Sequence, residues 1–223
     1  MRQFLLRLLL LLLVVLVIFG VYRLLTIRPL ENVDFFRDQP PLAALDSAAS
    51  YAPAAFDAAR QAGANGLYLP VDLTRDGVLV VTGSDVSELA LAELASVDTF
   101  ANTMTLQETL AAYPDLRAVV ALRQPSLQAL AALLQAIDAN DARSRVLAAV
   151  DHPLLAGTLR EQAPDLGTAT TSAETNAFLT TQRFRLMPFY RPAAPAMLLP
   201  GSQIDKRLVD AARNRGIHLV ALP

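Results

Sequence analysis

Five polar residues lie at or just beyond the ends of short apolar segments and could carry chemistry: Asp46, Asp72, Asp85, Arg123 and His152. Carboxylate oxygens bind hard divalent cations, a guanidinium binds phosphate, and an imidazole exchanges protons near neutral pH. The carboxyl ends of parallel strands meet at one edge of a sheet, where α/β proteins bind their ligands. We therefore take these residues as the candidates for a functional site.

Each candidate also has a purely structural interpretation. Asp72 precedes a turn, where an aspartate faces solvent or accepts hydrogen bonds from turn amides, and Asp85 can cap a helix. Arg123 fits a structural ion pair as well as a phosphate site. His152 fits an ordinary loop position before a helix, and His218, inside the last expected strand, should be packed.

The low number of histidines and the absence of cysteine exclude several kinds of functional site. The chain has only two histidines, His152 and His218, and no cysteine. Disulfides, thiolate catalysis and cysteine-ligated zinc are therefore excluded. The formal net charge of -2 gives no electrostatic argument for nucleic acid, so we expect no nucleic-acid partner.

The clearest local pattern runs from an alanine-rich helix into a hairpin. Residues 54–62 should form the helix, which ends at Gly63, a favourable position for glycine after a helix. Residues 67–73 predict a buried strand, and 74–77 a tight turn. The apolar residues 78–81 should return as the partner strand.

In the rest of the chain, segments whose apolar residues recur with helical spacing alternate with short apolar segments typical of strands. Helices are expected at residues 88–96, 107–113, 127–139, 153–162, 173–180 and 205–214. Strands are expected at residues 42–45, 116–122, 145–150, 167–171 and 217–221, with short extended pieces at 186–190 and 197–199. This alternation predicts an α/β fold with a parallel sheet.

The sequence from about residue 49 to the C-terminus resembles the glycerophosphodiester phosphodiesterase family. The matching segments are Gly63-Ala64-Asn65, Thr74-Arg75-Asp76-Gly77, Val80-Val81 and Thr105-Leu106-Gln107-Glu108. The resemblance implies a TIM-type (β/α) barrel and metal-dependent hydrolysis of phosphodiesters, with two histidines as general acid and base. It is specific only between residues 56 and 123.

The functional positions of the family carry other residues here. The resemblance places the metal-binding acids at Tyr68, Pro70 and Ala121, and one catalytic histidine at Gly83. The family's glutamate-asparagine pair corresponds to Ser50-Tyr51. None of these side chains replaces the family's acids or imidazole, so we interpret the chain as a degenerate member, with no catalytic residue and no cofactor expected.

Three functions remain open from the sequence. The first is a catalytically degenerate module that binds a ligand or scaffolds a membrane assembly. The second is an active phosphodiesterase whose calcium or magnesium is held by relocated ligands such as Asp46, Asp72 and Asp85. The third is a structural membrane subunit. The family has a further helix and strand after the strand matched by residues 217–221, so either the barrel is incomplete here or a non-standard element closes it. An open edge would suit a membrane-protein partner or a second copy.

The N-terminus predicts a membrane anchor. The apolar run of residues 4–25 is long enough to cross a bilayer as a helix at about 1.5 Å per residue. No small-residue cleavage motif follows it, which favours an anchor over a signal peptide. We expect an anchor at residues 1–27, a juxtamembrane linker at 28–41 and the barrel domain at 42–223. The expected location is the cell membrane, with a single pass, the N-terminus inside and the domain outside.

Overall fold

The computed structural model describes residues 7, 14–15, 34–37, 51–100 and 102–222. The expected anchor therefore lies almost entirely outside the described residues, as do the expected strand at 42–45 and Asp46. Within the described part of the chain, no helix is both long and apolar enough to cross a membrane.

The described domain alternates strands and helices in the expected α/β order. The strands are β1 (Gly66–Leu73), β2 (Leu79–Val81), β3 (Arg117–Leu122), β4 (Val146–Val150), β5 (Gly167–Thr168), β6 (Ala196–Pro200) and β7 (His218–Leu222). The helices are α2 (Pro53–Gln61), α3 (Leu91–Leu94), α4 (Leu106–Ala112), α5 (Leu127–Ala139), α6 (Pro153–Gln162), α7 (Ser172–Arg183) and α8 (Lys206–Arg213). Single 3-10 turns lie at η1 (Asp34–Phe36), η2 (Asp98–Phe100), η3 (Met187–Phe189) and η4 (Gly201–Gln203).

The sheet is mostly parallel, as predicted. One sheet has the order β2-β1-β3-β4-β5, in which only β2 is antiparallel to its neighbour, and β6 pairs with β7 in parallel. A parallel bridge between Ala169 and Ala196 links the two sheets. No described strand joins β7 to the β1–β2 hairpin, so the described strands form a curved α/β wall rather than a closed barrel.

Local sequence signals explain most of these elements. Gly77 has a φ of +83°, and its N–H donates to the Thr74 carbonyl at 2.9 Å, which makes the predicted hairpin turn. Thr105 and Glu108 form a capping box at the start of α4. Two expectations are wrong: the helix expected at 88–96 is limited to α3, and the extended piece expected at 186–190 contains the helical turn η3.

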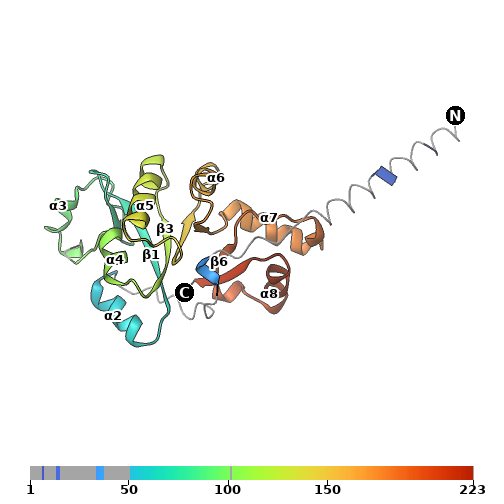
Figure 1. The fold of residues 1–223 in the computed structure, drawn as a ribbon, viewed down its shortest axis with the longest axis horizontal. Helices are drawn as coiled ribbons and strands as arrows, with labels where there is room; N and C mark the ends of the chain where they lie inside the picture. The colour runs from blue at the N-terminus through green and yellow to red at the C-terminus, as the bar shows by residue number, and fades with distance from the viewer. Residues whose placement is uncertain (1–6, 8–13, 16–33, 38–50, 101, 223) are drawn as a thin grey trace.

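Two apolar layers lie on either side of the larger sheet. The outer layer joins the sheet to α2, α4, α5 and α6, while α7 and α8 pack on β6 and β7 at the other end of the molecule (Figure 1). The inner layer lies in the hollow of the curved wall. Its buried members are Phe35, Val119, Leu147, Ala169, Ala196 and Val220.

Phe35 closes the inner layer at the amino ends of the strands. Its side chain is fully buried, its carbonyl accepts a hydrogen bond from the Arg117 guanidinium at 3.4 Å, and its ring centroid lies 5.4 Å from that group. The neighbouring Phe36 ring stacks on His218 at 3.9 Å, which agrees with the expectation that His218 is packed. Part of the segment expected to be a linker therefore belongs to the domain.

We predict that Phe35→Ala lowers the free energy of unfolding by about 3–5 kcal/mol, because it empties a fully enclosed site in the inner layer. Urea unfolding of the full chain followed by circular dichroism measures the change. Phe184, which is 66% exposed, is the matched control: Phe184→Ala should shift stability by no more than about 0.5 kcal/mol. Equal effects of the two substitutions would show that Phe35 is not a core residue.

Candidate functional site

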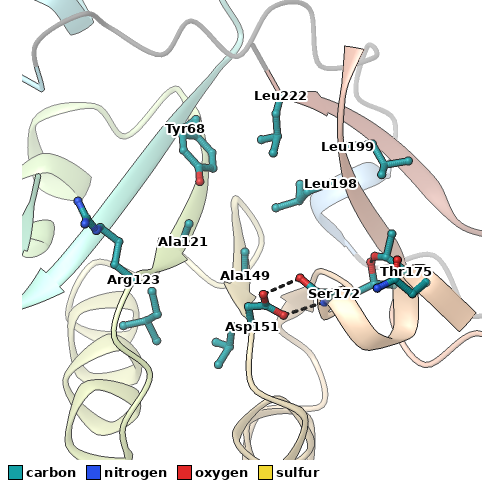
Figure 2. A pocket seen from close by; sticks show the side chains of 14 residues that line it. Tyr68, Ala121, Arg123, Ala149, Asp151, Ser172, Thr175, Leu198, Leu199 and Leu222 are labelled. Atoms are coloured by element: carbon teal, nitrogen blue, oxygen red, sulfur yellow. Dashed lines mark hydrogen bonds between the residues drawn. The ribbon is translucent and has the colours of Figure 1, made fainter. Parts of the chain in front are cut away.

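A pocket of about 450 Å³ opens at the carboxyl ends of the parallel strands. Tyr68 and Arg123 lie on one side of it, and Leu198 and Leu222, from β6 and β7, lie on the other (Figure 2). Ser172, at the start of α7, lies between them. Ligands of open α/β sheets bind at this edge, so this pocket is the candidate site.

The pairing of β1 with β3 determines which side chains reach the pocket. Tyr68 is opposite Val119, and Pro70 is opposite Ala121. Because alternate residues of a strand share a face, these four residues lie on the face that bears the inner layer, and Arg123 follows on the same face. Tyr68, Pro70 and Ala121 therefore occupy the inward positions, and none of them supplies a carboxylate.

Tyr68 is a neutral hydrogen-bonding group rather than a base. Burial raises the pKa of its phenol, and the nearby Tyr51 raises this pKa further, while the charge of Arg123 opposes the shift. A phenol whose pKa is raised above its ordinary value near 10 stays protonated at neutral pH. It can donate a hydrogen bond to a ligand, but it cannot accept a proton as a general base.

Asp151 also lines the pocket, but its carboxylate is bound to α7. One oxygen accepts a hydrogen bond from the Ser172 N–H at 2.7 Å, and the other accepts one from the Ser172 hydroxyl at 2.6 Å (Figure 2). A carboxylate at the N-terminus of a helix is stabilised by the free amides and the helix dipole. Asp151 therefore fixes the start of α7 against β4.

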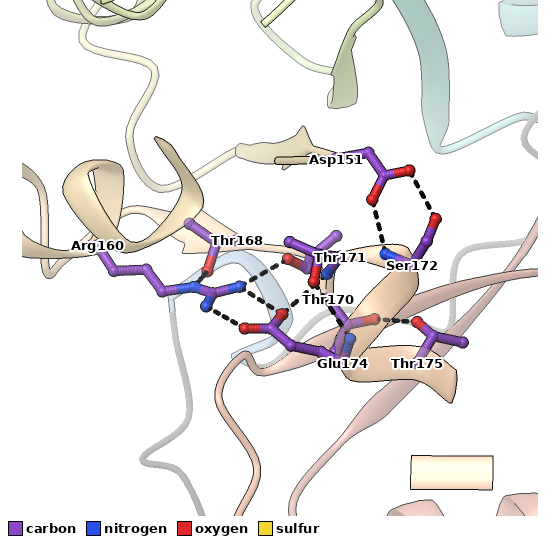
Figure 3. Close-up of polar contacts among 9 residues, drawn as sticks. Asp151, Arg160, Thr168, Thr170, Thr171, Ser172, Glu174 and Thr175 are labelled. Atoms are coloured by element: carbon purple, nitrogen blue, oxygen red, sulfur yellow. Dashed lines mark hydrogen bonds and ion pairs between the residues drawn. The ribbon is translucent and has the colours of Figure 1, made fainter. Parts of the chain in front are cut away.

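An ion pair outside the pocket holds the same loop from its other side. The Arg160 guanidinium contacts both carboxylate oxygens of Glu174, at 2.7 and 3.0 Å, and also donates to the Thr168 hydroxyl and the Ala169 carbonyl (Figure 3). Glu174 accepts in addition from the Thr171 N–H at 2.8 Å, which completes a capping box. Bidentate geometry and partial burial make this pair stronger than a surface ion pair.

Asp72 is buried and accepts a hydrogen bond from a backbone amide next to the turn, so of its two expected structural roles the amide contact is found and the solvent exposure is not. Its side chain is 1% exposed, one oxygen accepts from the Leu73 N–H at 3.0 Å, and the other has no hydrogen-bond partner among the described residues. Burial raises the pKa of Asp72; the Leu73 amide and Arg123 oppose this shift, and the nearby carboxylate of Asp85 adds to it.

The other candidates among the described residues do not come together in one site. Asp85 is exposed and accepts hydrogen bonds from the N–H and hydroxyl of Ser87 at 2.9 and 2.7 Å, so it stabilises a turn and does not cap a helix. His152 caps α6 by accepting from the Leu155 N–H at 3.4 Å, and it does not line the pocket. Arg123 is exposed at the pocket mouth, and its guanidinium makes no ion pair with any described residue.

Tyr51 occupies the space beside Gly83. A Cβ atom added at Gly83 would lie 3.0 Å from the Tyr51 ring, closer than ordinary van der Waals contact. Both residues line a second hollow next to the β2 end of the wall. Any side chain at position 83 would therefore have to displace the ring of Tyr51.

The described residues do not fit a divalent cation. Such ions need several oxygen ligands, and no group of three or more aspartates, glutamates and histidines converges within the described part of the chain. Of the neighbouring carboxylates, Asp151 already holds Ser172 and Asp85 already holds Ser87, and Asp72 alone does not make a site. No reaction step through a metal can be built on these side chains.

Several solved structures with a similar fold are phosphodiesterases. No model of a known family and no curated protein matches the sequence. A phosphodiesterase from Oleispira antarctica, solved with the product sn-glycerol-3-phosphate, matches with a TM-score of 0.62 and 16% identity over 82% of this chain and 84% of its own. A glycerophosphodiester phosphodiesterase from Agrobacterium tumefaciens matches with a TM-score of 0.59 and 16% identity over 76% and 80%. A glycerophosphoryl diester phosphodiesterase domain from Mycobacterium tuberculosis matches with a TM-score of 0.61 and 15% identity over 85% of both chains. The chain therefore shares the fold of this group.

We predict that Asp72→Asn stabilises the protein at pH 7 by about 1 kcal/mol, because it removes a buried charge that is poorly hydrogen-bonded. A carboxyl group whose pKa is raised by folding binds its proton more readily in the folded state, so it destabilises that state increasingly as the pH rises above the unfolded pKa. Urea unfolding at several pH values should show the gain at pH 7 and its disappearance below about pH 4.

Asp85→Asn is the control, because it should have the opposite sign. The Ser87 amide and hydroxyl lower the pKa of Asp85, so its charge stabilises the fold above the unfolded pKa and this contribution is lost as the pH falls. Asp85→Asn should therefore destabilise the protein at pH 7. A loss of stability at pH 7 in Asp72→Asn would contradict the assignment of a strained buried carboxylate.

Proposed function

We propose that this protein is a membrane-anchored binding module that uses a glycerophosphodiesterase-like barrel to hold a phosphate-bearing ligand without hydrolysing it. One observation carries the proposal: Tyr68, Pro70 and Ala121, the positions to which the sequence resemblance assigns the family's metal-binding acids, lie on the inner face of the wall, beside an open pocket. The chain keeps a ligand site and lacks the catalytic groups.

The pocket offers both parts that a small phosphate ester needs. Arg123 is a permanent cation at the mouth with no described ion-pair partner, and guanidinium groups bind phosphate oxygens through paired N–H donors. The phenol of Tyr68 can donate a further hydrogen bond. Leu198 and Leu222 supply an apolar wall for the rest of the ligand. The volume of the pocket falls in the ordinary range for small-molecule sites.

Hydrolysis would require a group that exchanges protons near neutral pH. The pKa of Tyr68 is raised by burial, and Asp151 is held by Ser172. Gly83 has no side chain, and Tyr51 fills the adjoining space. These observations support binding without acid-base chemistry at this pocket.

An active enzyme with relocated ligands is the second candidate. It is favoured by Asp72, whose buried carboxylate has an oxygen without a hydrogen-bond partner among the described residues and which lies close enough to Asp85 to sense its charge. Such a site would need at least one more ligand, and Asp46 lies outside the described residues. The hydrogen bonds of Asp85 to Ser87 weigh against it, because they use the same carboxylate.

The membrane part of the proposal rests on the hydropathy of residues 4–25. The proposed arrangement has the N-terminus inside, the domain outside, and the bilayer as a permanent partner. The edge between β7 and the β1–β2 hairpin is the proposed contact for a membrane protein or a second copy. Flotation of the full chain with vesicles at high salt tests the anchor, because salt does not release an inserted helix.

We predict that the full chain in detergent binds sn-glycerol 3-phosphate and that Arg123→Gln weakens this binding about 10- to 100-fold, the usual loss for a charge-assisted hydrogen bond. Isothermal titration calorimetry measures both affinities. Arg213→Gln is the matched control, because Arg213 is an exposed arginine at the end of α8, far along the chain from the pocket residues of β1 and β3. Absence of binding by the native chain, or equal losses in both variants, would contradict the proposal.

A further inference from the structure

An exposed segment of alternating arginine and apolar residues follows α7. Residues 183–191 read Arg-Phe-Arg-Leu-Met-Pro-Phe-Tyr-Arg and contain no acidic residue. Three apolar side chains of this segment are exposed, with Phe184 at 66%, Leu186 at 50% and Phe189 at 56%. Single exposed apolar residues are ordinary, but three large ones within six residues form a patch that normally meets a partner or a membrane.

The segment is built to present these side chains outward. Below it, Tyr190 packs edge-to-face on the buried Phe178 at 5.2 Å, and Met187 packs on the same apolar cluster. The chain turns at Arg185, whose φ of +58° is unfavourable for a residue other than glycine. The Leu186 N–H then closes the end of α7 by donating to the Thr181 carbonyl at 2.9 Å. The fold therefore supports a turn that exposes its apolar tips.

The charge around the tips has one sign. Arg183, Arg185 and Arg191 are all exposed, and none of them makes an ion pair with a described residue. Interfacial membrane segments have this composition, because apolar and aromatic side chains enter the headgroup region while arginines contact lipid phosphates. Charge complementarity therefore favours an anionic lipid surface as the occupant.

The patch lies in the chain between α7 and the amino end of β6. Helix α7 starts beside the pocket, and the chain then passes through the patch before it enters β6. Phe35 and Phe36 pack at this same amino end, against Arg117 and His218, the first residues of β3 and β7. The pocket lies at the opposite, carboxyl end of the strands.

We propose that residues 183–191 are a second membrane contact, which inserts Phe184, Leu186 and Phe189 into the interface of an anionic bilayer. Together with the anchor of the proposed function, this contact fixes the orientation of the domain. The amino ends of the strands face the bilayer, and the pocket opens away from it. The ligand then reaches Arg123 from the aqueous side and not from the lipids that hold the protein.

The chain contains no tryptophan, so the fluorescence of one introduced tryptophan reports on a single position. Phe189→Trp places the probe in the patch. Leu154→Trp is the matched control, because Leu154 is 77% exposed and starts α6 beside the pocket. The full-length variants are incorporated into vesicles of phosphatidylglycerol and phosphatidylcholine, with and without brominated acyl chains.

We expect brominated lipids to quench the Phe189→Trp emission at least twofold and to leave the Leu154→Trp emission unchanged. The substitutions Arg183→Glu, Arg185→Glu and Arg191→Glu, made together in the Phe189→Trp chain, should abolish the quenching. This variant should still float at high salt. Full emission of Phe189→Trp in brominated vesicles would overturn the proposal. A blue-shifted emission without quenching would also overturn it, since the patch would then be covered by protein.

These outcomes separate the patch from the anchor. If the chain fails to float at high salt, the anchor of the proposed function is wrong. Flotation at low salt that is lost in the triple glutamate variant would then still support the patch. If the chain floats at high salt and Phe189→Trp is not quenched, the anchor stands and the second contact is wrong.

Discussion

The parallel pairing of β1 with β3 is the constraint on which the rest of the structure depends. Its register sets Tyr68 opposite Val119 and Pro70 opposite Ala121, so the inner face of the wall presents a phenol, a proline and an alanine below Arg123 at the pocket. A shift of one residue would reverse both faces and bury the polar side chains instead. The chemistry available at the mouth is therefore decided by the strand pairing.

The two ends of the wall have different roles. At the amino ends, Phe35 closes the hollow and binds Arg117, and the exposed patch of residues 183–191 lies nearby in the chain's return to β6. At the carboxyl ends, Asp151 and the Arg160–Glu174 pair hold the start of α7 rigidly beside the pocket. In the account proposed here, the lipid contact and the phosphate site therefore lie at different ends of the wall.

Much of the local structure could be predicted because its signals are short. The turn at Gly77 and the capping box of Thr105 and Glu108 involve residues no more than four positions apart. Alternation of strands and helices predicted the parallel sheet for the same reason. Thr171 and Glu174 form a capping box of the same kind at the start of α7. The helix expected from the sequence begins one residue after the observed start at Ser172.

The site depended on contacts between distant segments, which no local pattern shows. Asp72 was expected to face solvent or to accept hydrogen bonds from turn amides, but it is buried, and one of its oxygens has no hydrogen-bond partner among the described residues. Phe35 fell in an expected linker, yet it binds Arg117, which is 82 positions away. The family resemblance had singled out Tyr68 and Ala121 as the positions of metal-binding acids, and only the register of β1 and β3 shows that both lie on the inner face. Burial and register are global properties, so they had to be seen in the fold.

The central claim is that the pocket binds a phosphate ester without cleaving it. The most direct measurement is hydrolysis of glycerophosphocholine and glycerophosphoethanolamine by the full chain, with calcium or magnesium and with a chelator as control. The account predicts no release of choline or ethanolamine above the chelator control. Metal-dependent turnover that the chelator abolishes would contradict it and would point to Asp72 and Asp85 as metal ligands.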